Sequence, residues 1–193
     1  MTTEIYRAYE AIWTFIQGYD GVLPDDLDLS TYPELAPFAE LVPSCRLLNY
    51  HEGEGEIVDE PDVLLIHDTE PDSIPEGVKL VVYLGCRMTH SLPLPESVIM
   101  VGYQRCEQLT VIKDLPSSVQ KLYMFEWQAF PDAVRVQITL PPAIRSATIQ
   151  TDRPIRFQGK WPATMEELAL IGTKVVKSQF RAPASLTITK TPA

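Results

Sequence analysis

A short phrase recurs along most of this chain of 193 residues. It consists of an apolar residue, a proline, two variable positions and a run of alternating apolar residues, as in Leu94-Pro95-Glu96-Ser97-Val98-Ile99-Met100-Val101. Six copies place proline at positions 75, 95, 116, 141, 162 and 183, with spacings of 20, 21, 25, 21 and 21 residues. A fixed period in this range is typical of a solenoid, in which each unit packs against its neighbours.

The apolar positions within each unit predict one parallel strand per repeat. They are spaced three and then two residues apart: Val78, Val81 and Tyr83; Val98, Val101 and Tyr103; Val119, Leu122 and Met124; Ile144, Ala147 and Ile149; Met165, Leu168 and Leu170. The last two positions alternate as in a strand, so these side chains should point into a shared core. The residues between them would line a continuous outward face.

The outward positions of the first three units are unusually apolar. A sheet face exposed to water alternates with polar residues, so something should cover this one. Two explanations fit: the N-terminal segment folds over the face, or the face is the core of an interface with a protein partner. The predicted partner-binding residues are Leu80, Val82, Leu84, Met100, Gln104, Lys121, Tyr123 and Phe125, together with the acidic residues Glu54, Glu56, Asp59, Glu60 and Asp68.

The segment before the repeats predicts a helical cap. Apolar residues spaced mostly three and four apart indicate an amphipathic helix over residues 4–17, and Pro33 suits the first position of a second helix over 33–41. Residues 45–50 and 63–66 read as short strands of degenerate repeats. We therefore expect a cap over residues 1–50, an acidic loop and degenerate first repeat over 51–73, and a solenoid over 74–193.

Charge is distributed unevenly. Residues 1–73 carry 17 Asp and Glu against two Arg, whereas residues 74–193 carry 14 Lys and Arg against nine acids, within a net charge of −10. Such asymmetry bears on partners and association rates. It favours a basic protein partner, and it disfavours nucleic acid because the acidic half would repel phosphate.

The repeat resembles the leucine-rich repeat proteins of the short Leu-Pro type, which are known best from bacterial secreted effectors. The resemblance covers residues 74–190 and implies a curved solenoid with a concave parallel sheet that binds protein partners. The family places Asn after each strand, where this chain has Cys86, Cys106, Trp127, Asp152 and Thr173. Because Trp cannot accept a hydrogen bond, the third unit should be distorted near residues 127–131.

The sequence contains few signals for catalysis. It lacks a nucleophile elbow, a phosphate-binding loop and a His-Glu-x-x-His motif, and we predict no catalytic residues, metal or cofactor. A pocket between cap and solenoid near His67, Asp68 and His90 is the enzymatic or small-ligand alternative. Three cysteines without a Cys-x-x-Cys pair predict buried free thiols at Cys45, Cys86 and Cys106.

These observations favour an α/β protein, a leucine-rich-repeat-like solenoid with an N-terminal helical cap. The expected function is non-enzymatic binding of a protein partner, as by an immunity or inhibitor protein against a basic toxin or enzyme. An effector acting on host proteins is the alternative that the resemblance suggests. No signal peptide or membrane span is visible, so we expect a cytoplasmic protein, or an effector secreted without a cleavable signal.

Overall fold

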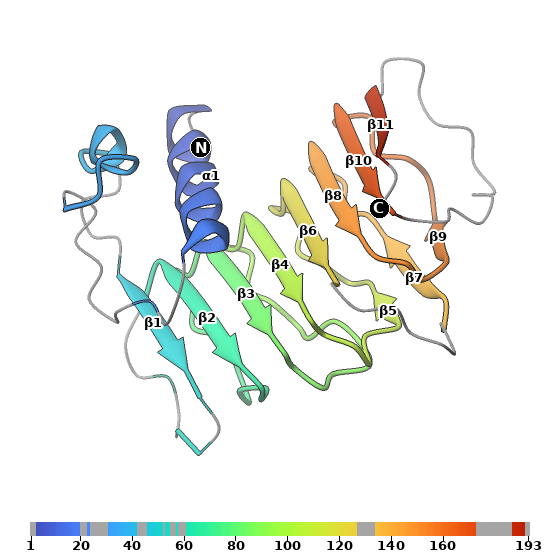
Figure 1. Cartoon of the computed structure of the whole chain (residues 1–193), viewed down its shortest axis with the longest axis horizontal. Coiled ribbons are helices and arrows are strands. Elements are labelled where there is room, and N and C mark those ends of the chain that lie inside the picture. Colours follow the sequence, from blue (N-terminus) through green and yellow to red (C-terminus); the bar gives the residue numbers. More distant parts are fainter. Residues whose placement is uncertain are drawn as a thin grey trace.

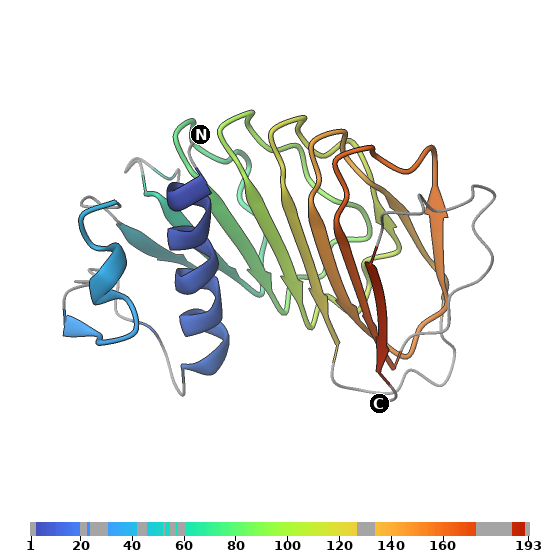
Figure 2. The ribbon, with the colours of Figure 1, turned by 90° about the horizontal axis from the view of Figure 1, so that it is seen from above.

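The computed structural model describes residues 3–19, 23, 31–41, 46–51, 53–54, 57, 61–126, 134–172 and 187–191. These residues form a parallel β-solenoid with an N-terminal helix packed against it, which confirms the predicted fold class (Figure 1). Each turn contributes one strand to a long sheet. The strands follow one another from one end of the molecule to the other (Figure 2).

Two parallel sheets form the walls of the solenoid within the described residues. Sheet A has eight strands in the order β1 (Leu47–Tyr50), β2 (Val63–His67), β3 (Leu80–Leu84), β4 (Met100–Gln104), β6 (Lys121–Phe125), β8 (Ser146–Gln150), β10 (Glu167–Ile171) and β11 (Thr187–Thr191). Sheet B has three strands in the order β5 (Val111–Ile112), β7 (Val136–Thr139) and β9 (Ile155–Gln158). The predicted strands at 45–50 and 63–66 correspond to β1 and β2.

The repeated phrase sets the register of sheet A. Leu80 pairs with Met100, Met100 with Lys121, Lys121 with Ser146, and Ser146 with Glu167, which are equivalent positions of successive repeats. The longer third unit leaves this register unchanged. The distortion predicted for residues 127–131 lies outside the described residues.

Proline opens a turn just before four of these strands. The proline carbonyl accepts a hydrogen bond from the backbone N–H three residues later, at 3.1–3.2 Å, in the pairs Pro95–Val98, Pro116–Val119, Pro141–Ile144 and Pro162–Met165. A bond between the first and fourth residues closes a β-turn. The two variable positions of the phrase are therefore the centre of the turn, and the following apolar residue is the first to enter the core.

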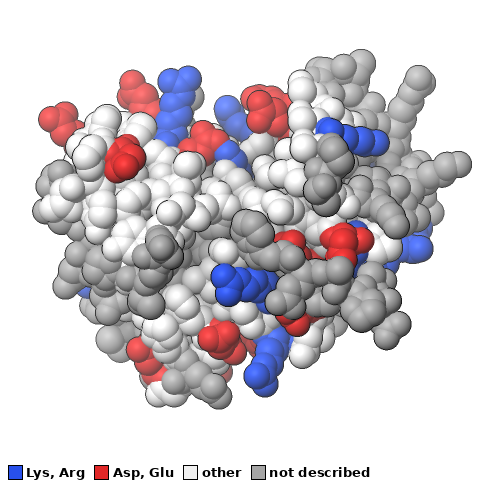
Figure 3. Space-filling model, viewed as in Figure 1, with Lys and Arg blue, Asp and Glu red and all other residues white. Residues whose placement is uncertain are grey.

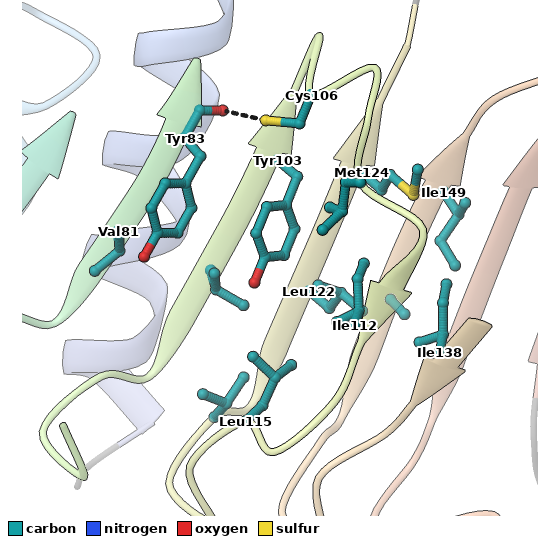
Figure 4. Packing of buried hydrophobic residues seen from close by; sticks show 14 of the residues in the cluster. Val81, Tyr83, Tyr103, Cys106, Ile112, Leu115, Leu122, Met124, Ile138 and Ile149 are labelled. Atoms are coloured by element: carbon teal, nitrogen blue, oxygen red, sulfur yellow. Dashed lines mark hydrogen bonds between the residues drawn. The ribbon is translucent and has the colours of Figure 1, made fainter. Parts of the chain in front are cut away.

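The predicted inward residues form the solenoid core. They are buried in one cluster that also takes in residues of sheet B, including Ile112 and Ile138 (Figure 4). Tyr83 and Tyr103 stack with ring centroids 5.4 Å apart. Period-two alternation and in-register stacking together account for this core.

Two cysteines replace the asparagine expected after the strands, and both are buried free thiols, as predicted. The Cys86 thiol donates to the backbone oxygen of Thr69 at 3.0 Å, and the Cys106 thiol donates to that of Tyr83 at 3.5 Å (Figure 4). Each thiol thus contacts backbone of the preceding repeat. Cys45 lies outside the described residues.

The amphipathic helix predicted at the N-terminus is α1 (Thr3–Gly18), and it lies across the outer face of sheet A (Figure 1). Its apolar side packs on residues of β1, β2, β3, β4 and β6. Trp13 lies over Gly102 and stacks on Tyr123 with ring centroids 4.5 Å apart. Lys121 forms an ion pair with Glu10, and the Tyr9 hydroxyl donates to Asp62 at 3.3 Å. The helix therefore covers the sheet rather than the end of the solenoid.

The second predicted helix, 33–41, is wrong as an α-helix. The structure has turns and a short 3-10 helix, η2 (Ala36–Phe38), whose first turn contains Pro37. Proline has no N–H and its ring clashes with the preceding turn, so the segment cannot continue as an α-helix. Neither described helix is long and apolar enough to span a bilayer.

A charged pair is buried where three repeats meet. Glu126 and Arg153 are only 6% and 2% exposed, and the guanidinium donates to both carboxylate oxygens, with Nε 2.9 Å from Oε2. Arg153 also donates to the backbone oxygen of Leu109 at 2.8 Å, and the Thr151 hydroxyl donates to Glu126. These bonds satisfy charges that burial would otherwise penalise.

Substituting Gly102 by alanine should weaken the packing of α1. A Cβ atom there would lie 2.8 Å from Trp13 Cζ3 and closer still to Cη2, so the indole must move. We expect a loss of about 1–3 kcal/mol in the free energy of unfolding, measured by urea denaturation. Gly18→Ala is the control, because a Cβ atom at Gly18 meets nothing within 4 Å. Equal midpoints for Gly102→Ala and wild type would contradict this packing.

Removing one member of the buried pair should be costly. Arg153→Met leaves the Glu126 carboxylate buried without its partner, and we expect a loss of about 3–5 kcal/mol in unfolding free energy. The double variant Glu126→Leu/Arg153→Met should recover part of it. Lys113→Met tests an exposed ion pair, 3.5 Å from Asp114, and should cost less than about 1 kcal/mol. If Arg153→Met also loses less than about 1 kcal/mol of unfolding free energy, the Glu126–Arg153 pair is no more important for stability than an exposed ion pair.

Candidate functional site

The apolar sheet face predicted to bind a partner is covered by the chain's own helix. Leu80, Val82 and Met100 are fully buried beneath α1, and Tyr123 is 6% exposed. Leu84 and Phe125 are half-buried against the same cluster. These six residues are therefore helix-packing residues in this structure. The alternative that the N-terminal segment folds over the face accounts for them.

The two polar residues predicted on this face lie at the border of α1. Lys121 is half-buried, with Nζ 5.1 Å from the centre of the Tyr123 ring and 5.9 Å from that of Tyr6. Burial lowers the pKa of Lys121 to about 8, although the charge of Glu167 acts in the opposite direction. Gln104, at the end of β4, is half-buried and lines a cleft described below.

The predicted acidic edge is divided by the fold. Glu54 is exposed, and its carboxylate accepts the backbone N–H of His51 at 2.8 Å. Asp68 follows β2 and lines the same cleft as Gln104. Glu56, Asp59 and Glu60 lie outside the described residues. Among the described residues, no group of three or more potential ligands could hold a metal ion.

The cleft lies at the carboxyl ends of β1 to β4, beside the end of α1. Its volume is about 800 Å³, within the range typical of ligand pockets. The helix contributes Ile16 and Gln17, and the turns after the strands contribute Asp68, Arg87 and Arg105. Carboxyl ends of parallel strands share one edge of a sheet, which is why residues of separate repeats meet here.

The residue after each of three successive strands adopts the left-handed backbone conformation. The φ angles are 57° at Asp68, 71° at Gly85 and 55° at Arg105. Each donates its N–H to the last residue of the next strand, at 2.8–2.9 Å, which holds the turn. Glycine adopts this conformation most readily. Asp68 and Arg105 therefore place charged side chains at backbone positions that favour glycine.

His67 is held at the cleft by a hydrogen-bond chain. Asn49 Nδ2 donates to the backbone oxygen of Leu23 at 2.7 Å, which leaves Oδ1 facing His67 Nε2 at 3.0 Å. Nε2 therefore carries the proton, and Nδ1 is an acceptor. Burial lowers the pKa of His67, and the neighbouring His51, stacked 4.4 Å away, lowers it further. Asp68 and Glu54 act in the opposite direction.

The structure brings together only part of the predicted His67, Asp68 and His90 group. His67 and Asp68 both line the cleft, but His90 lies outside it and contacts Thr89 Oγ1 at 2.8 Å. Sequence reasoning missed Asn49, Arg87 and Arg105. Gly85 and Gly172 after their strands were the available signal, because they mark the left-handed position that Asp68 and Arg105 also occupy.

Sheet A is covered unevenly along the solenoid. The cluster under α1 ends at β6, and on β8 the Tyr6 hydroxyl lies 3.5 Å from the Ser146 hydroxyl. The outward side chains beyond this contact are partly or fully exposed: Thr148, Gln150, Glu167, Ala169 and Ile171. We call these five residues the open face. The sequence matches no protein-family model and no curated protein.

The lowered pKa of His67 should make the fold less stable in acid. The unfolded chain takes up a proton near pH 6.5, before the folded protein does, so unfolding free energy should fall as pH drops through and below about 6.5. His67→Gln should reduce this dependence in urea denaturation at a series of pH values. His90→Gln, at an exposed position, is the control. If His67→Gln and wild type lose unfolding free energy equally as pH falls, His67 is not the source of this pH dependence.

Proposed function

We propose that this protein is a non-enzymatic protein-binding module of the leucine-rich-repeat type, and that it binds its partner through the open face. The main support for this proposal is that α1 covers only part of the outer face of sheet A. Helix α1 buries the apolar outer positions of β1, β2, β3, β4 and β6, whereas β8 and β10 present side chains with access to solvent. A face made by two adjacent, in-register strands of a solenoid suits recognition of a protein surface.

The composition of the open face supports this role. Threonine, glutamine and glutamate lie beside Ala169 and Ile171, so hydrogen-bonding groups alternate with small apolar patches. Protein interfaces of the non-obligate kind are about as apolar as ordinary surface, with polar groups at the rim. The open face therefore suits a partner that also exists unbound.

The repeat geometry supports the leucine-rich-repeat type. One strand per turn, a proline-opened turn and a buried residue after the strand that bonds the preceding repeat agree with the pattern expected from the sequence. Cys86 and Cys106 take the place of asparagine. The side of the turn opposite sheet A contains the short strands of sheet B rather than described helices.

The net charge of −10 favours a basic partner, such as the toxin or enzyme that an immunity or inhibitor protein would neutralise. On the side drawn in Figure 3, acidic and basic side chains are interspersed. Long-range attraction from the whole protein would therefore speed encounter, and the shape of the open face would select the partner.

Two bulky charges on the open face should abolish partner binding. We expect Thr148→Arg/Ala169→Arg to lose a partner that wild type retains in affinity capture from the cells that express the protein, because the arginines would block and repel a basic surface. Both positions face outward on adjacent strands. Wild-type capture should weaken as salt is raised.

The matched control is Gln158→Arg, at an exposed position of sheet B. All variants must keep the circular dichroism spectrum of wild type. Retention of the same partner by the double variant would exclude the open face as the binding surface.

A further inference from the structure

The cleft at the carboxyl ends of β1 to β4 has an acceptor side. Asp68 carries an exposed carboxylate on the β2 turn, and the neighbouring His67, whose Nε2 donates to Asn49, lines the cleft beside it. A Cβ atom at Gly85 would overlap Asp68 Oδ1, so the carboxylate leans over the glycine toward β4. This side is therefore suited to an ammonium group.

The opposite side of the cleft is rich in donors. Arg87 and Arg105 follow β3 and β4 and are exposed, and Gln104, the last residue of β4, lines the same cleft. Within the described part of the chain, neither guanidinium is within ion-pairing distance of a carboxylate, including those of Asp68 and Glu107, which line the same cleft. An arginine without a carboxylate partner can bind an anionic group through two parallel hydrogen bonds. This side is therefore suited to a carboxylate.

Between the two sides the cleft has an apolar wall. Ile16 comes from the end of α1, Leu65 from β2 and Leu23 from the segment between them. Leu23 and Leu65 are buried by these contacts. Pockets of this kind combine an apolar lining with a few polar groups that fix the orientation of the ligand. Ile16, Leu23 and Leu65 are 9%, 7% and 2% exposed, so they close the floor of the cleft and offer a bound ligand little apolar surface.

The separation of the charges limits the size of the ligand. Asp68 and Arg105 follow strands that are two positions apart in sheet A, which is about 9–10 Å between the chains. The lean of Asp68 over Gly85 shortens this gap. The termini of an extended dipeptide or tripeptide lie about 7–10 Å apart. A free amino acid holds its ammonium and carboxylate closer together than this backbone spacing, so it fits the two sides less well than a short peptide unless an arginine side chain reaches across the cleft.

We propose that this cleft binds a short peptide of two or three residues with free termini, its ammonium on Asp68 and its carboxylate on Arg105 and Arg87. The site is separate from the open face, since it is built from the turns after β2, β3 and β4. A test of peptide binding in the cleft is therefore independent of the proposed binding of a protein partner by the open face.

Calorimetry with the full chain and L-alanyl-L-leucine tests the proposal. The dipeptide should bind, and its N-acetylated and C-amidated forms should each bind roughly tenfold more weakly or worse, because each lacks one charge-assisted hydrogen bond. Free L-leucine should bind more weakly than the dipeptide. These comparisons use the wild-type protein, so they do not depend on the stability of any variant.

Two substitutions assign the termini within the cleft. Asp68→Asn should remove the preference for a dipeptide with a free amino terminus. Arg105→Gln should remove the preference for a dipeptide with a free carboxylate. The unfolding midpoint of each variant is compared with that of wild type to show that it is folded. Arg87→Gln repeats the second test if Arg105→Gln is unstable. Asp72→Asn and Arg135→Gln alter exposed residues outside the cleft and should bind as wild type. Failure of the dipeptide to bind at millimolar concentration, equal affinity for the blocked dipeptides, tighter binding of free leucine, or wild-type affinity of the cleft variants would each overturn the proposal.

Discussion

The structure depends on burial of both faces of sheet A over its first strands. The inner face packs in the solenoid core, as in any solenoid, but the outer positions of β2, β3 and β4 are also mostly apolar and would be exposed without α1. Covering them removes a large apolar surface from water. Gly102 makes this possible, because its lack of a side chain lets the Trp13 ring approach the sheet. The helix is thus part of the fold.

The extent of α1 determines where the remaining surfaces lie. The apolar cluster beneath it ends at β6, and the outward positions of β8 and β10 beyond Ser146 are accessible and mixed in polarity. The end of α1 meets the turns that follow β2, β3 and β4, and this junction forms the cleft. One helix placed diagonally on a parallel sheet therefore leaves two distinct surfaces, a strand face and a pocket at the strand ends.

Local chemistry explains where sequence reasoning succeeded and where it failed. The proline phrase predicted turn, strand and register, because a proline carbonyl can close a turn and period-two alternation is a property of the strand itself. Pro37 should have ruled out the second α-helix, since the ring clash is local. The buried pair Glu126 and Arg153 could not be anticipated, because the partners are 27 residues apart and meet only through the stacking of repeats.

The sequence by itself determined the repeat, the strand register, the inward core and the amphipathic helix, because each follows from spacing within a few residues. It also showed that the apolar outer face needed a cover, and left open whether the cover was the chain or a partner. Only the tertiary structure decided this, by placing Trp13 on Gly102 and Tyr123. The cleft, too, was decided only by the tertiary structure. Asp68, Arg87 and Arg105 line it together because strands distant in sequence end at one edge of the sheet.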